Sequence, residues 1–351
     1  MWRRAEGLRR HLALARAVAR ARRRPFDPFK LTWIVTEVCS LRCGPCQLWA
    51  TSPHPGPDLS TCERVLAANP QLTWLNLSGG DLVERPDAPA LLAAAARDLP
   101  DLALLDFPTA GQDTAATLAA LEPLLDSVIP RVVVSVSLDG PDDVHDRVRR
   151  RRGAAAAARA TFRRLETIRR PGFTVVAGLT LSASNVTAHG GVSPDALLPP
   201  GIPPGALHLN LAHHSAHYYR NTTDVAPPAE PALAVIEALA RRRGLPLSPL
   251  DWIERRYWRF ARRFLREGDP GVRCGALRAS VFLGPDLEVR PCTIFDRPLG
   301  NLADVGYALR RIPELQTARA ALGEVEARAC PRCWSPCEAF PTLLLNLGRS
   351  R

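Results

Sequence analysis

Short apolar runs alternate with stretches of helical periodicity from residue 31 onward. The apolar runs occupy 31–35, 72–77, 102–107, 131–138, 173–181 and 206–211. Between them, apolar residues recur at three- and four-residue steps, which predicts helices at 59–69, 87–98, 112–125, 143–168 and 228–243. The connection 182–205 is rich in proline and is only poorly marked as a helix. Strands that alternate with helices favour a parallel sheet, so we predict an α/β fold, a partial TIM-like (β/α)6 barrel.

The ends of the chain differ from this repeating pattern. We expect a basic N-terminal helix in residues 1–30, and a helix that links the barrel to a second unit in residues 246–270. Between Cys274 and Cys292 the sequence reads as a β-hairpin with a Gly-Pro-Asp turn. The predicted domains are the N-terminal helix, the barrel, the linking helix, a small C-terminal α+β domain and a tail, at 1–30, 31–245, 246–270, 271–338 and 339–351.

The N-terminal helix has an apolar face of Leu8, Leu12, Ala15 and Ala19 among many arginines. We expect this face to pack on the barrel as a cap. A basic amphipathic helix can also lie on an anionic membrane, so peripheral membrane contact remains an alternative. Binding of nucleic acid is disfavoured, because no aromatic residues interleave with the arginines to form a stacking surface.

Composition narrows the class of protein. The chain has 351 residues, of which 46% are hydrophobic, and no apolar run reaches the ~18–20 residues of a membrane span. The arginines near the start do not fit a signal peptide, so we expect a cytoplasmic protein. The net charge of +11 comes almost entirely from arginine, Lys30 being the single lysine, and we read it partly as a coding bias. Nine cysteines in a reducing compartment favour metal binding over disulfides.

Three of these cysteines, Cys39, Cys43 and Cys46, follow the first predicted strand at spacing C-x3-C-x2-C. Three thiolates can hold three irons of a 4Fe–4S cluster and leave the fourth iron open for chemistry. Three clustered cysteines also occur in zinc sites and beside redox pairs, so the spacing alone leaves these alternatives open. The C-terminal ends of barrel strands, where this triplet lies, are where such folds carry their chemistry.

Two further motifs make the chain resemble the radical S-adenosylmethionine (SAM) enzymes. The second predicted strand ends in Ser-Gly-Gly-Asp at 78–81, and the fourth in Ser-Leu-Asp-Gly-Pro at 137–141. The resemblance implies that the triplet binds a 4Fe–4S cluster whose open iron chelates SAM. It also implies a SAM-binding role for Gly79, Gly80, Asp81, Ser137, Arg149 and Asn185. Asp81 would take the SAM ammonium group in place of the family's glutamate, and Arg149 would pair with the SAM carboxylate. Pro45 departs from the aromatic residue usual in the family.

A second group of cysteines lies near the C-terminus and resembles the SPASM or shortened twitch domains of radical SAM enzymes. The resemblance implies one auxiliary 4Fe–4S cluster, with Cys337 as a spare thiol or as a substitute for one of its ligands. Zinc is the alternative, because four thiolates complete a tetrahedral site. Cys62 stands apart, and we expect it to be a buried structural thiol. The candidate ligands are Cys274, Cys292, Cys330, Cys333 and Cys337.

The resemblance implies an enzyme that cleaves SAM reductively to a 5′-deoxyadenosyl radical and then removes a hydrogen atom from its substrate. Assistance by an auxiliary cluster favours a net oxidation or a bond formation. Peptides, small molecules and lipids are all candidate substrates, and flavodoxin or ferredoxin is the kind of electron donor implied. The competing hypothesis is a non-enzymatic zinc protein that contacts nucleic acid or an acidic partner. The roles of His213, His214 and His217, after the sixth strand, stay open.

Overall fold

A nine-stranded sheet organises the molecule. The computed structural model describes residues 2–187, 193–221, 223, 225–246 and 249–347. Strands run in the order β6-β5-β4-β3-β2-β1-β7-β8-β9, and neighbours from β6 to β1 are parallel. The first six strands are β1 (Lys30–Thr36), β2 (Trp74–Gly79), β3 (Leu104–Thr109), β4 (Arg131–Ser137), β5 (Phe173–Leu181) and β6 (Leu207–Leu211). The predicted α/β fold, an open barrel of six parallel strands, is confirmed.

The C-terminal strands continue the barrel sheet. β7 (Ser280–Leu283) pairs in parallel with β1, and β8 (Glu288–Arg290) pairs antiparallel with β7. The short β9 (Gly300–Asn301) completes the edge. The predicted hairpin between Cys274 and Cys292 therefore exists, and through β7 it is hydrogen-bonded to the first barrel strand.

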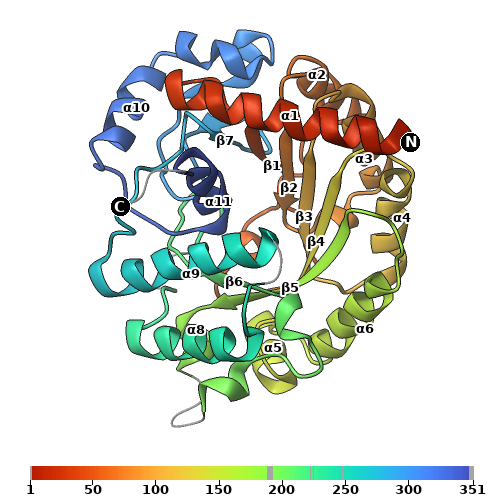
Figure 1. Ribbon diagram of the computed structural model, residues 1–351, viewed down its shortest axis with the longest axis vertical. Helices are drawn as coiled ribbons and strands as arrows, with labels where there is room; N and C mark the ends of the chain where they lie inside the picture. The colour runs from red at the N-terminus through yellow and green to blue at the C-terminus, as the bar shows by residue number, and fades with distance from the viewer. Residues whose placement is uncertain (1, 188–192, 222, 224, 247–248, 348–351) are drawn as a thin grey trace.

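Helices cover the outer face of the curved sheet (Figure 1). Leu31, Trp33 and Val35 of β1 are buried against them, because successive side chains of a strand point to opposite faces. The other face of each strand points into the barrel. The outer helices are α2 (Leu59–Ala67), α3 (Ala88–Asp98), α4 (Thr114–Leu125), α5 (Asp142–Arg149), α6 (Ala154–Glu166) and α8 (Ala229–Arg243).

One predicted helix, 143–168, is wrong as a single element. It is divided into α5 and α6 at Arg150–Gly153, where Arg150 has φ 51° and Gly153 has φ 83°. A left-handed residue ends a helix, because it turns the backbone away from the helix axis. Within the described residues, the proline-rich connection after β5 contains only the four-residue α7 (Ala183–Val186) and two 3-10 helices, at Pro194–Leu197 and Pro204–Ala206.

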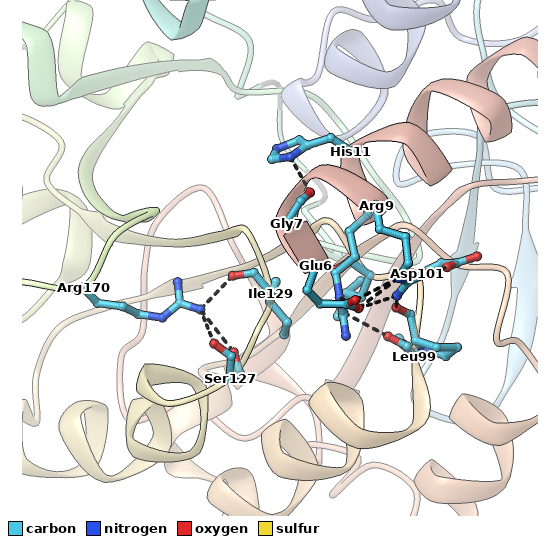
Figure 2. Close-up of polar contacts among 12 residues, drawn as sticks. Glu6, Gly7, Arg9, His11, Leu99, Asp101, Ser127, Ile129 and Arg170 are labelled. Atoms are coloured by element: carbon cyan, nitrogen blue, oxygen red, sulfur yellow. Dashed lines mark hydrogen bonds and ion pairs between the residues drawn. The ribbon is translucent and has the colours of Figure 1, made fainter. Parts of the chain in front are cut away.

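The N-terminal helix α1 (Trp2–Arg23) lies across the end of the sheet where β3 and β4 begin (Figure 1). Arg10 is buried and donates hydrogen bonds to the carbonyls of Leu99 and Leu102, just before β3. Figure 2 shows the neighbouring Arg9 between Glu6 and Asp101. The helix therefore caps the barrel, as predicted.

The face of α1 that packs on the barrel differs from the prediction. Leu8 is 63% exposed and Leu12 is 48% exposed, and Ala15 and Ala19 also face solvent. The buried side chains on the opposite side are Arg10, Ala17, Val18 and Ala21. The small residues on this side allow the helix to pack closely on the barrel. The arginines between them made this side look polar in the sequence.

Two helices lie between β6, one edge strand of the sheet, and β7, which follows β1 in the strand order (Figure 1). These are α9 (Pro249–Glu267) and α11 (Pro336–Leu345), and α10 (Ala318–Glu326) lies further out. His208 of β6 contacts Glu254 of α9 and Phe340 of α11. Ser280 of β7 is hydrogen-bonded to Glu338 of α11. No helix in the described part of the chain is both long and apolar enough to span a membrane.

Candidate active site

The three cysteines of the first motif lie on the loop after β1, at the C-terminal edge of the sheet. Cys43 is buried, Cys39 and Cys46 are half-buried, and all three border one cavity of about 290 Å³. Burial raises the pKa of Cys39 to about 12 and that of Cys46 to about 11. Binding of a metal cluster would therefore have to displace protons from these thiols.

Side-chain donors hold this loop in shape. Trp49 Nε1 donates to the carbonyls of Cys43 and Cys46, at 3.1 and 2.8 Å. Asn221 Nδ2 donates to the carbonyl of Pro45 at 3.1 Å. Pro45 has no N–H of its own, so its carbonyl is its polar link to the rest of the site. These bonds fix the backbone between the second and third cysteines before any cluster binds.

Gly79 and Gly80 allow the end of β2 to touch the strand that leads into the cysteine loop. A Cβ atom on Gly79 would lie 1.9 Å from the carbonyl oxygen of Thr36, and one on Gly80 would lie 2.0 Å from that of Val38. Gly79 also has φ 150°, which disfavours other residues. Both glycines border the cavity. Their first structural role is thus to bring the second strand against the cysteine loop.

Asp81 and Asn185 are buried to the side of the cavity and are not among the described residues that line it. The Asp81 carboxylate accepts hydrogen bonds from Thr109 Oγ1 at 3.0 Å and from the Ala110 N–H at 2.8 Å. Burial raises its pKa to about 6. Asn185 Nδ2 donates to the carbonyl of Thr180 at 2.8 Å. Both side chains hold strand ends together in this structure.

Ser137 and Arg149 do line the cavity, beside the cysteine loop. Arg149 Nε donates to Asp139 Oδ2 at 2.7 Å, and one of its terminal nitrogens lies 3.7 Å from Cys43 Sγ. Burial alone would lower the pKa of Arg149. The carboxylate of Asp139 and the thiol of Cys43 have a larger effect in the other direction, so the pKa of Arg149 lies above its usual value. A fixed positive charge therefore faces the cavity at the end of β4.

Four of the C-terminal cysteines border a second, smaller cavity of about 60 Å³. The N–H of Phe295 points at Cys292 Sγ at 3.2 Å, and the N–H of Ala276 points at Cys274 Sγ at 3.5 Å. Backbone donors aimed at sulfur suit thiolates that bind a cluster, since such hydrogen bonds stabilise their negative charge. The four cysteines are Cys274, Cys292, Cys330 and Cys333.

Cys337 is in a different place from these four. It lies in the first turn of α11 and borders the large cavity, opposite the first cysteine loop. Cys62 is fully buried in the outer layer, as expected of a structural thiol. Among the described residues, no three His, Cys, Asp or Glu side chains are arranged to hold a single metal ion. A 4Fe–4S cluster bonds each cysteine to a separate iron, so its ligands need not meet at one point.

The histidines after β6 are in a loop and do not share a helix face. His213 borders the large cavity, where its Nε2 accepts a hydrogen bond from the Trp334 N–H at 3.3 Å. His217 Nε2 donates to the carbonyl of Cys292 at 3.0 Å, so it contacts the C-terminal cysteine region. His214 is exposed. Burial lowers the pKa of His213 and that of His217 to about 4.

Sequence reasoning missed the polar floor of the large cavity, which lies deeper in the barrel than the cysteine loop. Four side chains from β1, β2, β3 and β6 form much of it, each on the inward face of its strand. All four stand between two apolar residues, in Phe-Lys-Leu, Leu-Asn-Leu, Leu-Asp-Phe and Leu-His-Leu, and that alternation could have revealed them. The floor residues are Lys30, Asn76, Asp106 and His208.

Comparison with known proteins bears on the fold. No family model matches the chain, and no curated protein matches it by sequence. Native anSMEcpe with bound AdoMet is similar in structure, with a TM-score of 0.54, 13% identity, and coverage of 84% of this chain and 82% of that one. Streptococcus suis SuiB bound to precursor peptide SuiA has a TM-score of 0.52, 14% identity, and coverage of 80% and 64%.

These neighbours are radical SAM enzymes, and one of them holds SAM itself, under its abbreviation AdoMet. The similarity extends over most of this chain, 84% and 80% of it in these two comparisons. At this level of identity it establishes the architecture, which agrees with the resemblance drawn from the cysteine and glycine motifs. The chain has the fold of the radical SAM enzymes.

Proposed function

We propose that the chain is a radical SAM enzyme. The observation that carries this proposal is that Cys39, Cys43 and Cys46 border the same cavity as Gly79, Gly80, Ser137 and Arg149. These residues come from the ends of β1, β2 and β4 and the segments that follow them, with Arg149 at the end of α5, as expected for a site at the C-terminal edge of a parallel barrel. When bound, the cluster supplies an electron that cleaves SAM to the 5′-deoxyadenosyl radical, which then removes a hydrogen atom from the substrate.

The residues around the cluster loop would bind and orient SAM. Arg149, fixed by Asp139, offers a guanidinium that suits a carboxylate. Ser137 lies beside it as a hydrogen-bonding group. The side chains of Asp81 and Asn185 would not touch SAM directly, because both are hydrogen-bonded to strand ends beside the cavity. They position the strand ends that carry the binding groups.

The second cavity would hold one auxiliary 4Fe–4S cluster, bound by Cys274, Cys292, Cys330 and Cys333. Four thiols and several aimed N–H groups fit such a cluster. We propose that Cys337 is not one of its ligands, since it faces the other cavity. Four protein ligands close the cluster, which favours electron transfer over direct binding of substrate, and hence a net oxidation or bond formation.

The remaining partners follow from this chemistry. The enzyme needs a one-electron donor such as flavodoxin or ferredoxin, in a reducing compartment such as the cytoplasm. A peptide is a supported candidate substrate, because a neighbour of the same fold binds a precursor peptide. Small molecules and lipids remain alternatives. The arginines of α1 that are engaged with the barrel weaken the case for contact with a membrane.

Formation of 5′-deoxyadenosine tests the proposal. The anaerobically reconstituted protein should convert SAM to 5′-deoxyadenosine and methionine when dithionite is added. Replacement of Cys39, Cys43 and Cys46 by alanine should abolish this product, whereas Cys62→Ser should retain it. Wild-type protein that carries a full complement of iron and still makes no 5′-deoxyadenosine would contradict the proposal.

A further inference from the structure

The floor of the large cavity is charged where a barrel of this type is ordinarily apolar. Inward-facing positions of (β/α) barrels are filled mainly by Val, Ile and Leu, which pack into a solid core. Here β1, β2 and β3 instead place Lys30, Asn76 and Asp106 on the cavity wall. Burial of such groups is costly unless each finds a partner. The floor is therefore built to meet a polar group.

The ammonium of Lys30 makes fewer hydrogen bonds than it has N–H donors. Its side chain is 2% exposed, and its ammonium donates one hydrogen bond, to the carbonyl of Cys337. The ammonium also lies 4.5 Å from the centre of the Trp74 ring. Two buried carboxyl groups, Asp106 and Glu338, lie close enough for the Lys30 charge to oppose the rise in their pKa that burial causes, but among the described residues neither comes within ion-pair distance of the ammonium. An ammonium has three N–H donors, so its capacity is not filled by these contacts.

Asn76 offers an acceptor beside this cation. Its Nδ2 donates to Asp106 Oδ1 at 2.5 Å, so its Oδ1 must point the other way. That oxygen is buried and has no hydrogen-bond partner among the described residues, although Asn76 is only 6% exposed. Asp106 itself is occupied on both oxygens, since Trp74 Nε1 donates to its Oδ2 at 2.5 Å. An unfilled cation and an unfilled acceptor thus lie on one wall.

We propose that this floor anchors the substrate by a carboxylate, with Lys30 as the counter-ion and Asn76 Oδ1 accepting a hydrogen bond from a neighbouring N–H or O–H of the same substrate. The nearby negative charge of Asp106 favours a monoanion over a phosphate dianion. Substrates of this class include hydroxy acids, amino acids, and peptides through an acidic side chain or the C-terminus. The inference rests on the proposed function, because it names what the radical site acts on.

The single lysine makes a direct test available. Protein labelled with [ε-13C]lysine gives one side-chain signal, which reports on this floor alone. Holoprotein with oxidised clusters and saturating SAM would be titrated with acetate, glycolate, methyl glycolate and inorganic phosphate, against sodium chloride at equal ionic strength. We expect saturable shifts with acetate and glycolate, with glycolate binding about fivefold more tightly because its hydroxyl reaches Asn76. Methyl glycolate, which lacks the charge, should cause none.

The variant Asn76→Ala separates the two parts of the site. It also frees Asp106 Oδ1, so the readout is the ratio of the two affinities, which should fall from about five to about one because glycolate loses the acceptor for its hydroxyl. If this variant does not fold, the comparison of glycolate with acetate in the wild type still decides the role of the acceptor. Shifts with phosphate alone, equal shifts with methyl glycolate, or no shift with any probe would each overturn the inference.

Failure of the proposed function would look different. The same preparation is assayed for 5′-deoxyadenosine. Carboxylate binding without SAM cleavage would leave the anchoring site intact and reject the radical chemistry. SAM cleavage without any response of the Lys30 signal would keep the enzyme and reject the anchoring site.

Discussion

Cys337 is the C-terminal cysteine whose role the sequence left open, as a spare thiol or as a substitute for one of the four chosen ligands. Spacing cannot decide between these roles, because the sequence does not show which cavity each thiol borders. The structure separates them, with four around the small cavity and Cys337 on the wall of the large one. The separation follows from α11, which begins at Pro336 and turns Cys337 toward the barrel.

This separation predicts different effects of two serine variants. Cys337→Ser should keep the iron and sulfide content of the wild type, because no cluster ligand is lost. Cys333→Ser should lose about four irons, those of the auxiliary cluster. Iron and labile sulfide are measured after anaerobic reconstitution of both. Equal iron loss in the two variants would show that Cys337 is a ligand after all.

Gly80 is a second residue with a sharp expectation. A methyl group there would lie 2.0 Å from the carbonyl oxygen of Val38, which neither backbone can relieve without moving the cysteine loop. We expect Gly80→Ala to lower the free energy of unfolding by about 1–3 kcal/mol and to reduce retention of the first cluster. Gly205→Ala is the matched control, because a Cβ there would meet no atom within 4 Å. Similar unfolding curves for the two variants would contradict this account.

The site residues that could be predicted are those that belong to a sequence motif, where the offset along the chain sets their place. The cysteine triplet, Gly79, Gly80, Ser137 and Arg149 all border the cavity as their motifs suggest. Asp81 and Asn185 do not, because a motif position gives the backbone location and leaves the direction of the side chain open. The floor residues were missed, because they come together only when distant strands align in the sheet.

At the scale of elements, α1 is docked by a buried arginine and by small residues. A helix with Leu8 and Leu12 on one face would ordinarily bury that face. Here Arg10 instead satisfies the carbonyls of Leu99 and Leu102, and Ala17, Val18 and Ala21 permit close packing. Sequence periodicity could predict that the helix exists, but a charged residue in the buried stripe concealed its orientation.

The docking of α1 can be tested by substitution. Arg10→Ala would leave two buried carbonyls without a donor, so we expect a loss of about 2–3 kcal/mol in the free energy of unfolding. Leu12→Ala, on the exposed face, should change it by less than about 0.5 kcal/mol. Denaturant unfolding under anaerobic conditions measures both. A larger loss for Leu12→Ala would mean that the leucine face is buried in solution.

The helices of the barrel were predicted well where polar and apolar residues alternate cleanly. The break between α5 and α6 was missed, because Gly153 is a single weak helix former within a run of alanines and arginines through 147–160, and an isolated glycine is tolerated in a helical pattern. The left-handed conformation of Arg150 and Gly153, which divides the predicted helix, depends on the tertiary structure around these residues. The break ends α5 at Arg149, so that this side chain reaches the cavity.

At the scale of the whole molecule, the order of strands and helices determined the fold class. Six parallel strands and their five connections could be predicted because parallel strands need crossover connections, and these are long enough to be seen. The continuation of the same sheet into β7, β8 and β9 could not, because strands of two to four residues carry little pattern. This continuation connects the C-terminal cysteine region directly to β1.

At the scale of the whole molecule, the buried His145 should make the stability of the protein depend on pH in mild acid. Burial lowers the pKa of His145 to about 4 from the ordinary value of 6.5, and its Nδ1 accepts a hydrogen bond from the Asp139 N–H. Between these values the unfolded chain binds a proton that the folded chain excludes. The free energy of unfolding therefore falls as pH falls from about 6.5 to about 4, by about 3 kcal/mol for this residue.

The variant His145→Gln should flatten that dependence, since glutamine does not titrate. The measurement is denaturant unfolding of wild type and variant at several pH values between 4 and 7. The free energy of unfolding of the wild type should fall relative to that of the variant as the pH is lowered from about 6.5 to about 4. Parallel curves across this range would show that His145 is protonated in the folded state as readily as in the unfolded one.

The central claim is that two groups of cysteines hold two 4Fe–4S clusters, one of them at the SAM site. The most direct test is the iron and labile sulfide content of anaerobically reconstituted wild-type protein beside the Cys39/Cys43/Cys46→Ala variant. The account predicts about eight irons in the wild type and about four in the variant. Zinc without labile sulfide in the wild type, or equal iron in both proteins, would contradict it.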